Sequence, residues 1–507
     1  MRRAKLNFTS EKAYNFRMDF SKSQYTAIVS DLHLCEEEPV HPKFPLWKKY
    51  KTRQFFFDED FLGFLKKIES KASGQKIELV LNGDIFDFDS VTGLPDSPPY
   101  KISALEENRG LHPQEEKSEF KIKRILEHHP LWVKSVKNFI AQGNVAIFVI
   151  GNHDLELHFK RVQKVILDAL AENEADRKKI RFNEWFYISN ADTLIEHGNQ
   201  YDPYCVCQDP INPFVQKFNQ IEVRVPFGNL TTRYLVNAMG FFNPHLDSNY
   251  IMTPSEYVRF FTKYMVRAQP LLVLDWLTGA TLALTQAFTD RLKPKMTDPL
   301  TIEDRIEEIA FKANATPRMV RELRELFVAP AASNPILLMK ELWLDRSLIL
   351  LVAIVVLYLV FLQIDNIFDI SVWWLFIPFS LFIPFFLFYA RSVISSVGVF
   401  KEPQEKILSL AGLITKVSRV VYGHTHIVRH EIVGPIEHLN SGTWSPAFLD
   451  VECEHPVGQK TYIWIAPAEE VGPGGELTRD AKVFQFKNGQ EHEVFASGGR
   501  ADRQLMG

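Results

Sequence analysis

The chain has 507 residues, which is more than one hydrophobic core normally serves, so we expect more than one structural unit. Apolar residues make up 46% and charged residues 24%, a balance that excludes a disordered, collagen-like or low-complexity chain. The formal net charge of -4 offers no general attraction for nucleic acid, so we expect no nucleic-acid partner. Cys35, Cys205, Cys207 and Cys453 are too few and too scattered for a disulfide framework and indicate a reducing compartment.

The first part of the chain alternates between strand and helix patterns. Three short apolar runs predict buried strands, at residues 25–30, 77–81 and 145–150. Between them, residues 59–67 and 131–142 have helical patterns, and the second ends at Gly143 as a helix stop should. This alternation predicts an α/β fold.

Residues 210–345 differ, because they are rich in helical patterns and aromatic residues and show no strand alternation. We expect a helical insertion there. Within it, residues 270–288 are nearly long enough to span a membrane, but Asp275 and several threonines make a crossing unfavourable. A buried or interfacial helix is therefore expected for that stretch.

Two uncharged apolar runs, at residues 347–364 and 372–390, are each close to the roughly 20 residues that cross a bilayer. They predict a transmembrane hairpin; the alternative is a pair of buried core helices. No apolar stretch follows the basic N-terminus, so we expect no signal peptide. Positive residues flank the pair and acidic residues occupy the loop, which predicts that the long arms before and after the hairpin both lie in the cytoplasm, at the inner membrane if the protein is bacterial. These residues are Lys340, Arg346, Arg391 and Lys401 outside, and Asp365 and Asp369 in the loop.

After Ala411 the strand patterns resume, and the Gly-rich end of the chain contains one more strand-like run before an expected flexible tail. Five segments are therefore predicted: the first part of the core at 1–209, the helical insertion at 210–345, the hairpin at 346–391, the second part of the core at 392–465, and a C-terminal strand and tail at 466–507.

Short polar clusters follow the predicted strands, where an open α/β sheet can build a site. They contain Asp31, His33, Asp84, Asn152, His153, Asp154, His197, His424 and His426. Carboxylate, imidazole and amide groups suit two divalent metal ions, with manganese favoured and iron, zinc or magnesium as alternatives, better than they suit a thiolate site. We expect the D-x-H and H-x-H segments to be extended, so that both side chains approach one metal. A capping or satisfied polar role explains any one cluster, but not the whole set in this order.

Glycine precedes Asp84, Asn152 and His424, where it would let the backbone turn tightly beside the ions.

The set resembles the pattern of the calcineurin-like metallophosphoesterase family, which is D-x-H, G-D, G-N-H-D or E, H, and G-H-x-H. The resemblance covers roughly residues 25–205 and 410–465 and implies a layered β-sheet core flanked by helices, with the insertion and hairpin outside it. It implies one metal held by Asp31, His33 and His426, a second held by Asn152, His197 and His424, and Asp84 as the bridge.

Two metals can activate a hydroxide for attack on phosphorus, so no protein nucleophile is needed. His153 is then expected to act as general acid or charge stabiliser, with Asp154 orienting its ring. Asp87 is either a second-shell partner of a ligand or a cap of the following segment.

Residues 30–39 and 423–432 also look like the opening and closing motifs of the bacterial UDP-2,3-diacylglucosamine pyrophosphohydrolases. Those enzymes typically carry Arg where this chain has His153, and they lack the membrane hairpin. They build an acyl-chain cap where this chain has its helical insertion, so the resemblance implies a lipid-binding lid. Residues 43–57, rich in basic and aromatic side chains, would bind anionic headgroups or form a solvated loop.

We therefore expect a membrane-anchored, metal-dependent hydrolase of a phosphoester or pyrophosphate bond in a lipid or lipid-linked nucleotide. The alternatives are a membrane-tethered phosphodiesterase of soluble nucleotides and a non-catalytic membrane scaffold. The oligomeric state is left open.

Overall fold

The computed structural model describes residues 23–217, 220–240, 272–293, 299–393, 404–456, 458–468 and 478–495, with isolated positions at Arg259, Thr262 and Lys263. The expected absence of a signal peptide and the expected flexible tail fall mainly on residues outside these ranges.

A seven-stranded mixed sheet forms one half of the core, in the order β14-β13-β12-β1-β2-β3-β4. Strands β1 to β4 are parallel to one another, and β12 joins β1 in antiparallel register. The strands are β1 (Tyr25–Val29), β2 (Ile77–Asn82), β3 (Val145–Val149), β4 (Ile180–Asn183), β12 (Thr461–Pro467), β13 (Arg479–Lys487) and β14 (Gln490–Glu493). The three strands predicted in the first part of the chain are confirmed.

A second sheet of five strands has the order β10-β11-β9-β6-β5. Its central strands β6, β9 and β11 are parallel, although β6 comes from the first part of the chain and the other two from the second. The strands are β5 (Phe186–Ser189), β6 (Thr193–Glu196), β9 (Arg419–Tyr422), β10 (Arg429–Val433) and β11 (Ile436–Asn440). The pairing of β6 with β9 closes the core across the insertion and the hairpin.

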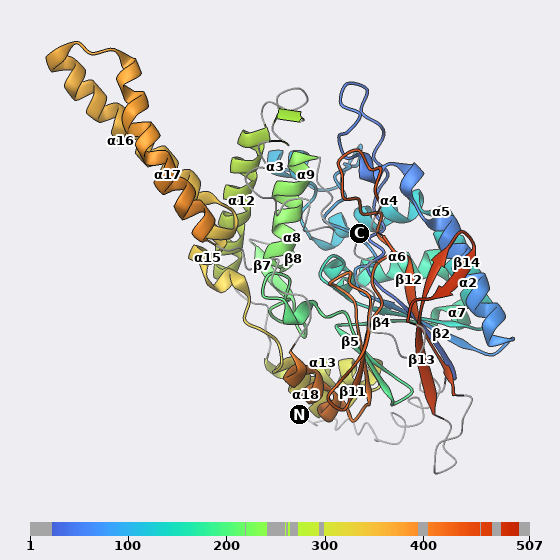
Figure 1. The fold of residues 1–507 in the computed structure, drawn as a ribbon. Helices are drawn as coiled ribbons and strands as arrows, with labels where there is room; N and C mark the ends of the chain where they lie inside the picture. Colours follow the sequence, from blue (N-terminus) through green and yellow to red (C-terminus); the bar gives the residue numbers. More distant parts are fainter. Residues whose placement is uncertain are drawn as a thin grey trace, which may run out of the picture.

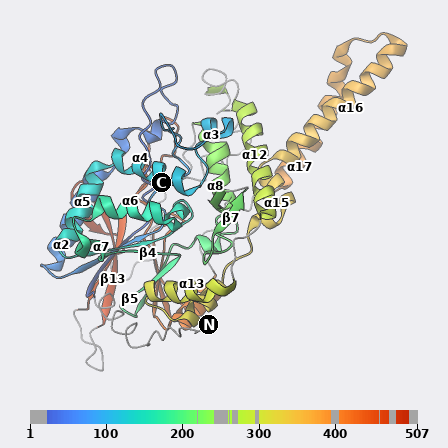
Figure 2. The ribbon, with the colours of Figure 1, turned by 180° about the vertical axis from the view of Figure 1, so that it is seen from behind.

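The two sheets pack face to face, and helices cover both outer faces, so the core has four layers (Figures 1 and 2). Ile28 and Val80 of the larger sheet meet Tyr187 and Val421 of the smaller one between the sheets. The outer face of the larger sheet is covered by α2 (Asp58–Ala72), α4 (Glu115–His128), α5 (Pro130–Ala141) and α6 (Lys160–Leu170). A mixed α/β core with layered sheets is thus confirmed, and α2 and α5 contain the two predicted helices.

Part of the predicted helical insertion belongs to the core. The outer face of the smaller sheet is covered by α13 (Pro299–Lys312), α14 (Pro317–Arg324) and α18 (Glu405–Thr415). The insertion also begins with a two-stranded ribbon, β7 (Phe214–Lys217) and β8 (Gln220–Val223), so the expectation of no strands there is wrong.

The remaining insertion helices lie between the core and the hairpin (Figure 1). They are α8 (Phe227–Thr231), a π-helical turn (Thr232–Val236), α9 (Asn237–Met239), α12 (Leu272–Leu292) and α15 (Pro335–Glu341). Helix α12 buries Gly279 and Ala283 on one side and exposes Leu274 and Phe288 on the other. It is not one of the two candidate spans in the described part of the chain, in agreement with the expectation of a partly buried helix.

The two predicted spans form helices α16 (Leu344–Phe368) and α17 (Phe376–Ser392), joined by a short turn and projecting away from the body (Figure 1). The spans Leu344–Phe368 and Val372–Ser392, the second of which includes the turn Val372–Leu375, are long and apolar enough to cross a membrane, with mean hydropathies of 2.9 and 1.9, and their most apolar stretches are 0% buried. The alternative of two buried core helices is therefore wrong. At the foot of the hairpin, Tyr389 donates a hydrogen bond of 2.7 Å to Asp345, and Arg346 donates one of 3.3 Å to the Val393 carbonyl.

Candidate metal centre

The predicted ligands lie just after the carboxyl ends of five strands. Asp31, Asp84 and Asn152 follow the neighbouring parallel strands β1, β2 and β3 of the larger sheet. His197 and His424 follow β6 and β9, which are neighbouring parallel strands of the smaller sheet. Because the two sheets pack face to face, these five ends meet at one edge of the core.

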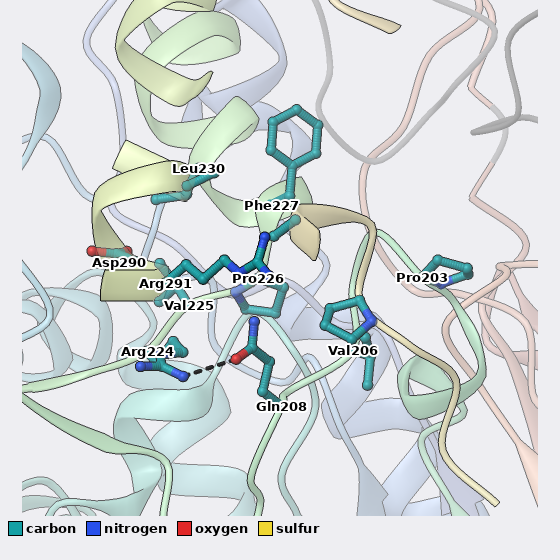
Figure 3. A pocket seen from close by; sticks show the side chains of 13 residues that line it. Pro203, Val206, Gln208, Arg224, Val225, Pro226, Phe227, Leu230, Asp290 and Arg291 are labelled. Atoms are coloured by element: carbon teal, nitrogen blue, oxygen red, sulfur yellow. Dashed lines mark hydrogen bonds between the residues drawn. The ribbon is translucent and has the colours of Figure 1, made fainter. Parts of the chain in front are cut away.

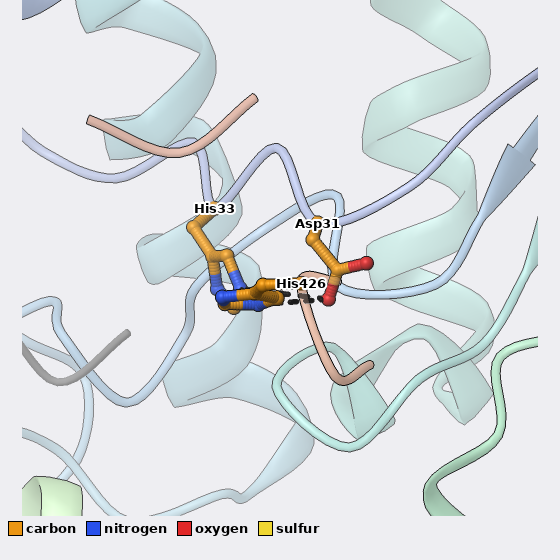
Figure 4. Close-up of side chains that lie close together, drawn as sticks. All are labelled: Asp31, His33 and His426. Atoms are coloured by element: carbon orange, nitrogen blue, oxygen red, sulfur yellow. Dashed lines mark hydrogen bonds and ion pairs between the residues drawn. The ribbon is translucent and has the colours of Figure 1, made fainter. Parts of the chain in front are cut away.

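Asp31, His33 and His426 form the first group (Figure 4). The Nε2 atom of His426 lies 3.1 Å from Asp31 Oδ1 and 3.4 Å from His33 Nε2. Two ligand atoms that each lie about 2.1 Å from an ion, at right angles, are about 3 Å apart, so these spacings fit one shared cation.

Asp84, His197 and His424 form the second group. The Nε2 atom of His197 lies 3.1 Å from Asp84 Oδ2. That same oxygen lies 4.0 Å from His33 Nε2 in the first group. Asp84 therefore stands between the two groups, where a bridging carboxylate would have to lie.

The buried Asn152 Oδ1 atom has no hydrogen-bond partner in the described part of the chain, and the close polar contacts of Asp31 Oδ1 and His197 Nε2 are with other predicted ligands. Buried polar atoms are normally satisfied, and leaving one unsatisfied costs about 1–3 kcal/mol. Carboxylate, amide and imidazole atoms brought together in this way at one point fit coordination of divalent cations.

The backbone at the ligands differs from the extended form expected. Asp31, His33, Asp84, His424 and His426 have φ angles of 53°, 48°, 52°, 66° and 59°. These left-handed conformations are uncommon for residues other than glycine and cluster at functional sites. The expectation that D-x-H and H-x-H are extended is wrong: the strands end earlier, and left-handed turns bring the side chains together.

The expected role of the preceding glycines is confirmed. A Cβ atom on Gly83 would lie 2.4 Å from the His197 ring, and one on Gly151 would lie 2.3 Å from Asp84 Oδ1. At Gly423 it would lie 2.7 Å from Asp31 Oδ2. Only a residue without a side chain lets these loops approach the ligands so closely.

The carboxylates of the centre are held in their charged form. Burial raises the pKa of Asp84, but His197 and His153 outweigh it and hold that pKa well below its usual range. Burial lowers the pKa of His197, but Asp84 and Asp31 raise it to about 9. A divalent cation would compete with protons for these imidazoles, so its binding would release protons.

His153 lies beside the first group, with its ring centroid 4.9 Å from that of His33. Its Nδ1 atom is 3.3 Å from Asp87 Oδ1. Burial lowers its pKa, but Asp84 and Asp87 raise it to about 10. Asp87 also accepts a 3.1 Å hydrogen bond from the Ser90 backbone, which fits the expected cap, and its contact with His153 is with the expected acid.

Asp154 does not orient the His153 ring as expected. Its two carboxylate oxygens accept hydrogen bonds from the backbone of Gly151, at 2.7 Å, and of Ile85, at 2.9 Å. Asp154 therefore holds together the two loops that carry Asp84 and Asn152, and Asp87 contacts the imidazole instead. Burial and the nearby Asp84 raise the pKa of Asp154 to about 7.

Sequence reasoning missed two residues at the centre. Asp202 Oδ2 lies 3.1 Å from His424 Nε2. Asn229, in α8 of the insertion, donates to the Asn152 carbonyl at 2.8 Å and to Asp89 at 2.6 Å. Neither residue belongs to a recognisable motif, and Asn229 is distant from Asn152 in sequence, so only the fold brings them together.

The basic side chains at residues 43–57 mainly contact the protein itself. Lys51 donates to the Ser90 carbonyl at 2.7 Å, and Lys49 donates to the Glu452 carbonyl at 2.5 Å. Lys48 lies 3.5 Å from Glu38, and burial lowers its pKa to about 8. These contacts give the basic residues a structural role in fixing the loop.

No known family model matches the chain, and no curated protein matches its sequence.

Proposed function

We propose that this protein is a membrane-anchored phosphoesterase with a binuclear metal centre, and that it hydrolyses a phosphoester or pyrophosphate bond in a lipid or lipid-linked nucleotide. The position of Asp84 carries the proposal, because its Oδ2 atom is within 4.0 Å of a histidine from each ligand group. The ordered resemblance to the calcineurin-like metallophosphoesterases supports the same chemistry.

Two divalent ions in this centre would supply a hydroxide nucleophile and polarise the phosphate oxygens. Asp31, His33 and His426 would hold one ion, Asn152, His197 and His424 the other, with Asp84 between them. Asp202 would orient His424 through its 3.1 Å contact with Nε2.

His153 would donate a proton to the leaving oxygen, which avoids release of an alkoxide or an unprotonated phosphate. Its raised pKa keeps the imidazole protonated at neutral pH. Asp87 contacts Nδ1, which directs Nε2 away from Asp87 for that transfer.

The hairpin supports a membrane substrate. The hairpin is inserted between β6, which precedes His197, and β9, which precedes His424. Because both strands belong to one core, the chain must return to the same side of the membrane from which it left. Helix α16 of the hairpin contacts α15 and α12. Helix α12 in turn contacts α8, whose Asn229 donates a hydrogen bond to Asn152. This placement would hold the centre close to the bilayer and raise the effective concentration of lipid.

The test is hydrolysis by detergent-purified protein with added Mn²⁺, comparing UDP-2,3-diacylglucosamine, a panel of lipid phosphates and soluble nucleotides. We expect turnover of at least one lipid substrate and none by Asp84→Asn. Asp304→Asn is the matched control, because Asp304 is exposed on α13 and belongs to none of the candidate ligand groups in the described part of the chain.

Turnover of soluble nucleotides alone would leave the hairpin as an anchor and overturn the lipid substrate. No turnover by metal-loaded protein would favour the scaffold alternative.

A further inference from the structure

A second polar pocket lies where the insertion joins the core, and Figure 3 shows the side chains around it. Four segments meet there: the loop after β6, the turn between β8 and α8, the end of α12, and the loop before α15. Pro203, Val206 and Phe227 form apolar walls, whereas Gln208, Arg224 and Arg291 bring polar groups. None of these residues belongs to the candidate metal centre.

The central side chain of this pocket is Arg224, which is only 9% exposed. Its Nη1 atom donates to Gln208 Oε1 at 2.8 Å (Figure 3), and its Nη2 atom donates to the Lys293 carbonyl at 3.3 Å. Its buried Nε atom has no hydrogen-bond partner in the described part of the chain. Both of its contacts are to neutral groups, so no carboxylate within ion-pair distance neutralises this guanidinium among the described residues.

The neighbouring charges do not make up this deficit. Asp290 lines the pocket, and its charge and that of Asp209 act on Arg224, but Asp290 contacts Lys293 and accepts a 2.7 Å hydrogen bond from Gln286. Lys293 also lies 3.2 Å from Glu222. Arg291 adds a second guanidinium, whose contact is with the Ser333 carbonyl at 3.1 Å. Among the residues that line the pocket, the two guanidiniums of Arg224 and Arg291 thus face one carboxylate, which is already engaged with Lys293.

A buried charge without an opposite charge is unfavourable, and a planar guanidinium with free donors matches the oxygens of an oxyanion. We propose that this pocket binds a phosphoryl oxyanion, either free phosphate or the terminal phosphate of a larger molecule, through Arg224 and Arg291. The apolar walls would exclude water from the ion pair and strengthen it.

The site is separate from the metal centre but shares an element with it. Phe227 and Leu230 of α8 face the pocket, and Asn229 of the same short helix contacts Asn152. A bound anion would therefore stabilise the helix that supports a candidate metal ligand.

The test is isothermal titration of inorganic phosphate into full-length, detergent-purified protein stripped of metal with EDTA, so that the metal centre contributes no binding. We expect saturable binding by wild type and a loss of affinity of about 10-fold or more in Arg224→Gln, because hydrogen bonds to charged groups contribute about 1.5–3 kcal/mol. Arg224→Lys should retain part of the affinity. Arg318→Gln is the control, since that arginine is 83% exposed on α14, and it should bind like wild type.

Arg224 is buried, so its replacement could affect folding, whereas Arg291 is exposed. Arg291→Gln should therefore weaken phosphate binding without a folding defect. A second titration with hexyl phosphate distinguishes the sources: tighter binding than inorganic phosphate identifies a phosphate carried on an apolar group, and equal or weaker binding identifies free phosphate. Absence of phosphate binding by stripped wild type, or an affinity equal to that of wild type in both Arg224→Gln and Arg291→Gln, would overturn the site. Metal content and turnover test the proposed function separately.

Discussion

Asp87 is the residue through which the proposed acid can be tested. Its carboxylate lies 3.3 Å from His153 Nδ1 and contributes to the raised pKa of that imidazole. Asp87→Asn should lower the pKa of His153, shift the alkaline limb of the pH–kcat/KM profile to lower pH, and reduce kcat by about 10-fold to 100-fold. The measurement is the pH–rate profile with the best substrate.

Ser90→Ala is the matched control, because it removes a hydroxyl that contacts Asp87 but leaves the carboxylate charge in place. Its profile should resemble that of wild type. An unchanged alkaline limb in Asp87→Asn would assign the proton donor to another group.

At the scale of elements, the sequence pattern predicted β1, β2 and β3 because each is a short apolar run that is buried almost throughout, and α2 and α5 because each buries one apolar face. The β7–β8 ribbon escaped detection because its strands are only four residues long and lie in an aromatic-rich stretch. The ligand types followed from the motifs, but their left-handed backbone did not, since it depends on how the two sheets meet. The contacts of Asp202 and Asn229 likewise depend on tertiary packing.

A buried histidine in the turn Leu155–His158 makes a pH-dependent contribution to stability. His158 is buried there, and burial together with Arg305, Lys312 and Lys160 lowers its pKa to about 3. In the unfolded chain this imidazole binds a proton below about pH 6.5. Its contribution is therefore fully present above pH 6.5 and is lost as the pH falls from 6.5 toward 3, by at most about 1.4 kcal/mol per pH unit.

Between pH 7 and pH 5, the free energy of unfolding should therefore fall less in His158→Gln than in wild type. The measurement is the midpoint of urea unfolding at each pH. His455→Gln serves as the control, because the His455 side chain is 72% exposed. Equal losses in His158→Gln and wild type would show that His158 titrates normally in the folded chain.

At the scale of the whole molecule, the hairpin is an appendage whose two ends lie together. The contacts of Tyr389 with Asp345 and of Arg346 with Val393 join the start of α16 to the end of the hairpin. Replacing residues 344–392 by a short Gly/Ser linker should leave the four-layer core folded and release the protein from membranes. The measurement is membrane flotation, with far-ultraviolet circular dichroism to check the fold.

Continued flotation of the folded, shortened chain would show that another surface binds the membrane. The exposed apolar side of α12 would then be the first candidate.

The central claim is that one edge of the core holds two metal ions, and the most direct measurement is metal content per chain by mass spectrometry after loading with Mn²⁺ and removal of excess metal. The account predicts two ions in wild type and in Asp304→Asn, and fewer than two in Asp84→Asn, because Asp84 lies between the two groups. Fewer than two ions in wild type, or two ions in Asp84→Asn, would contradict it.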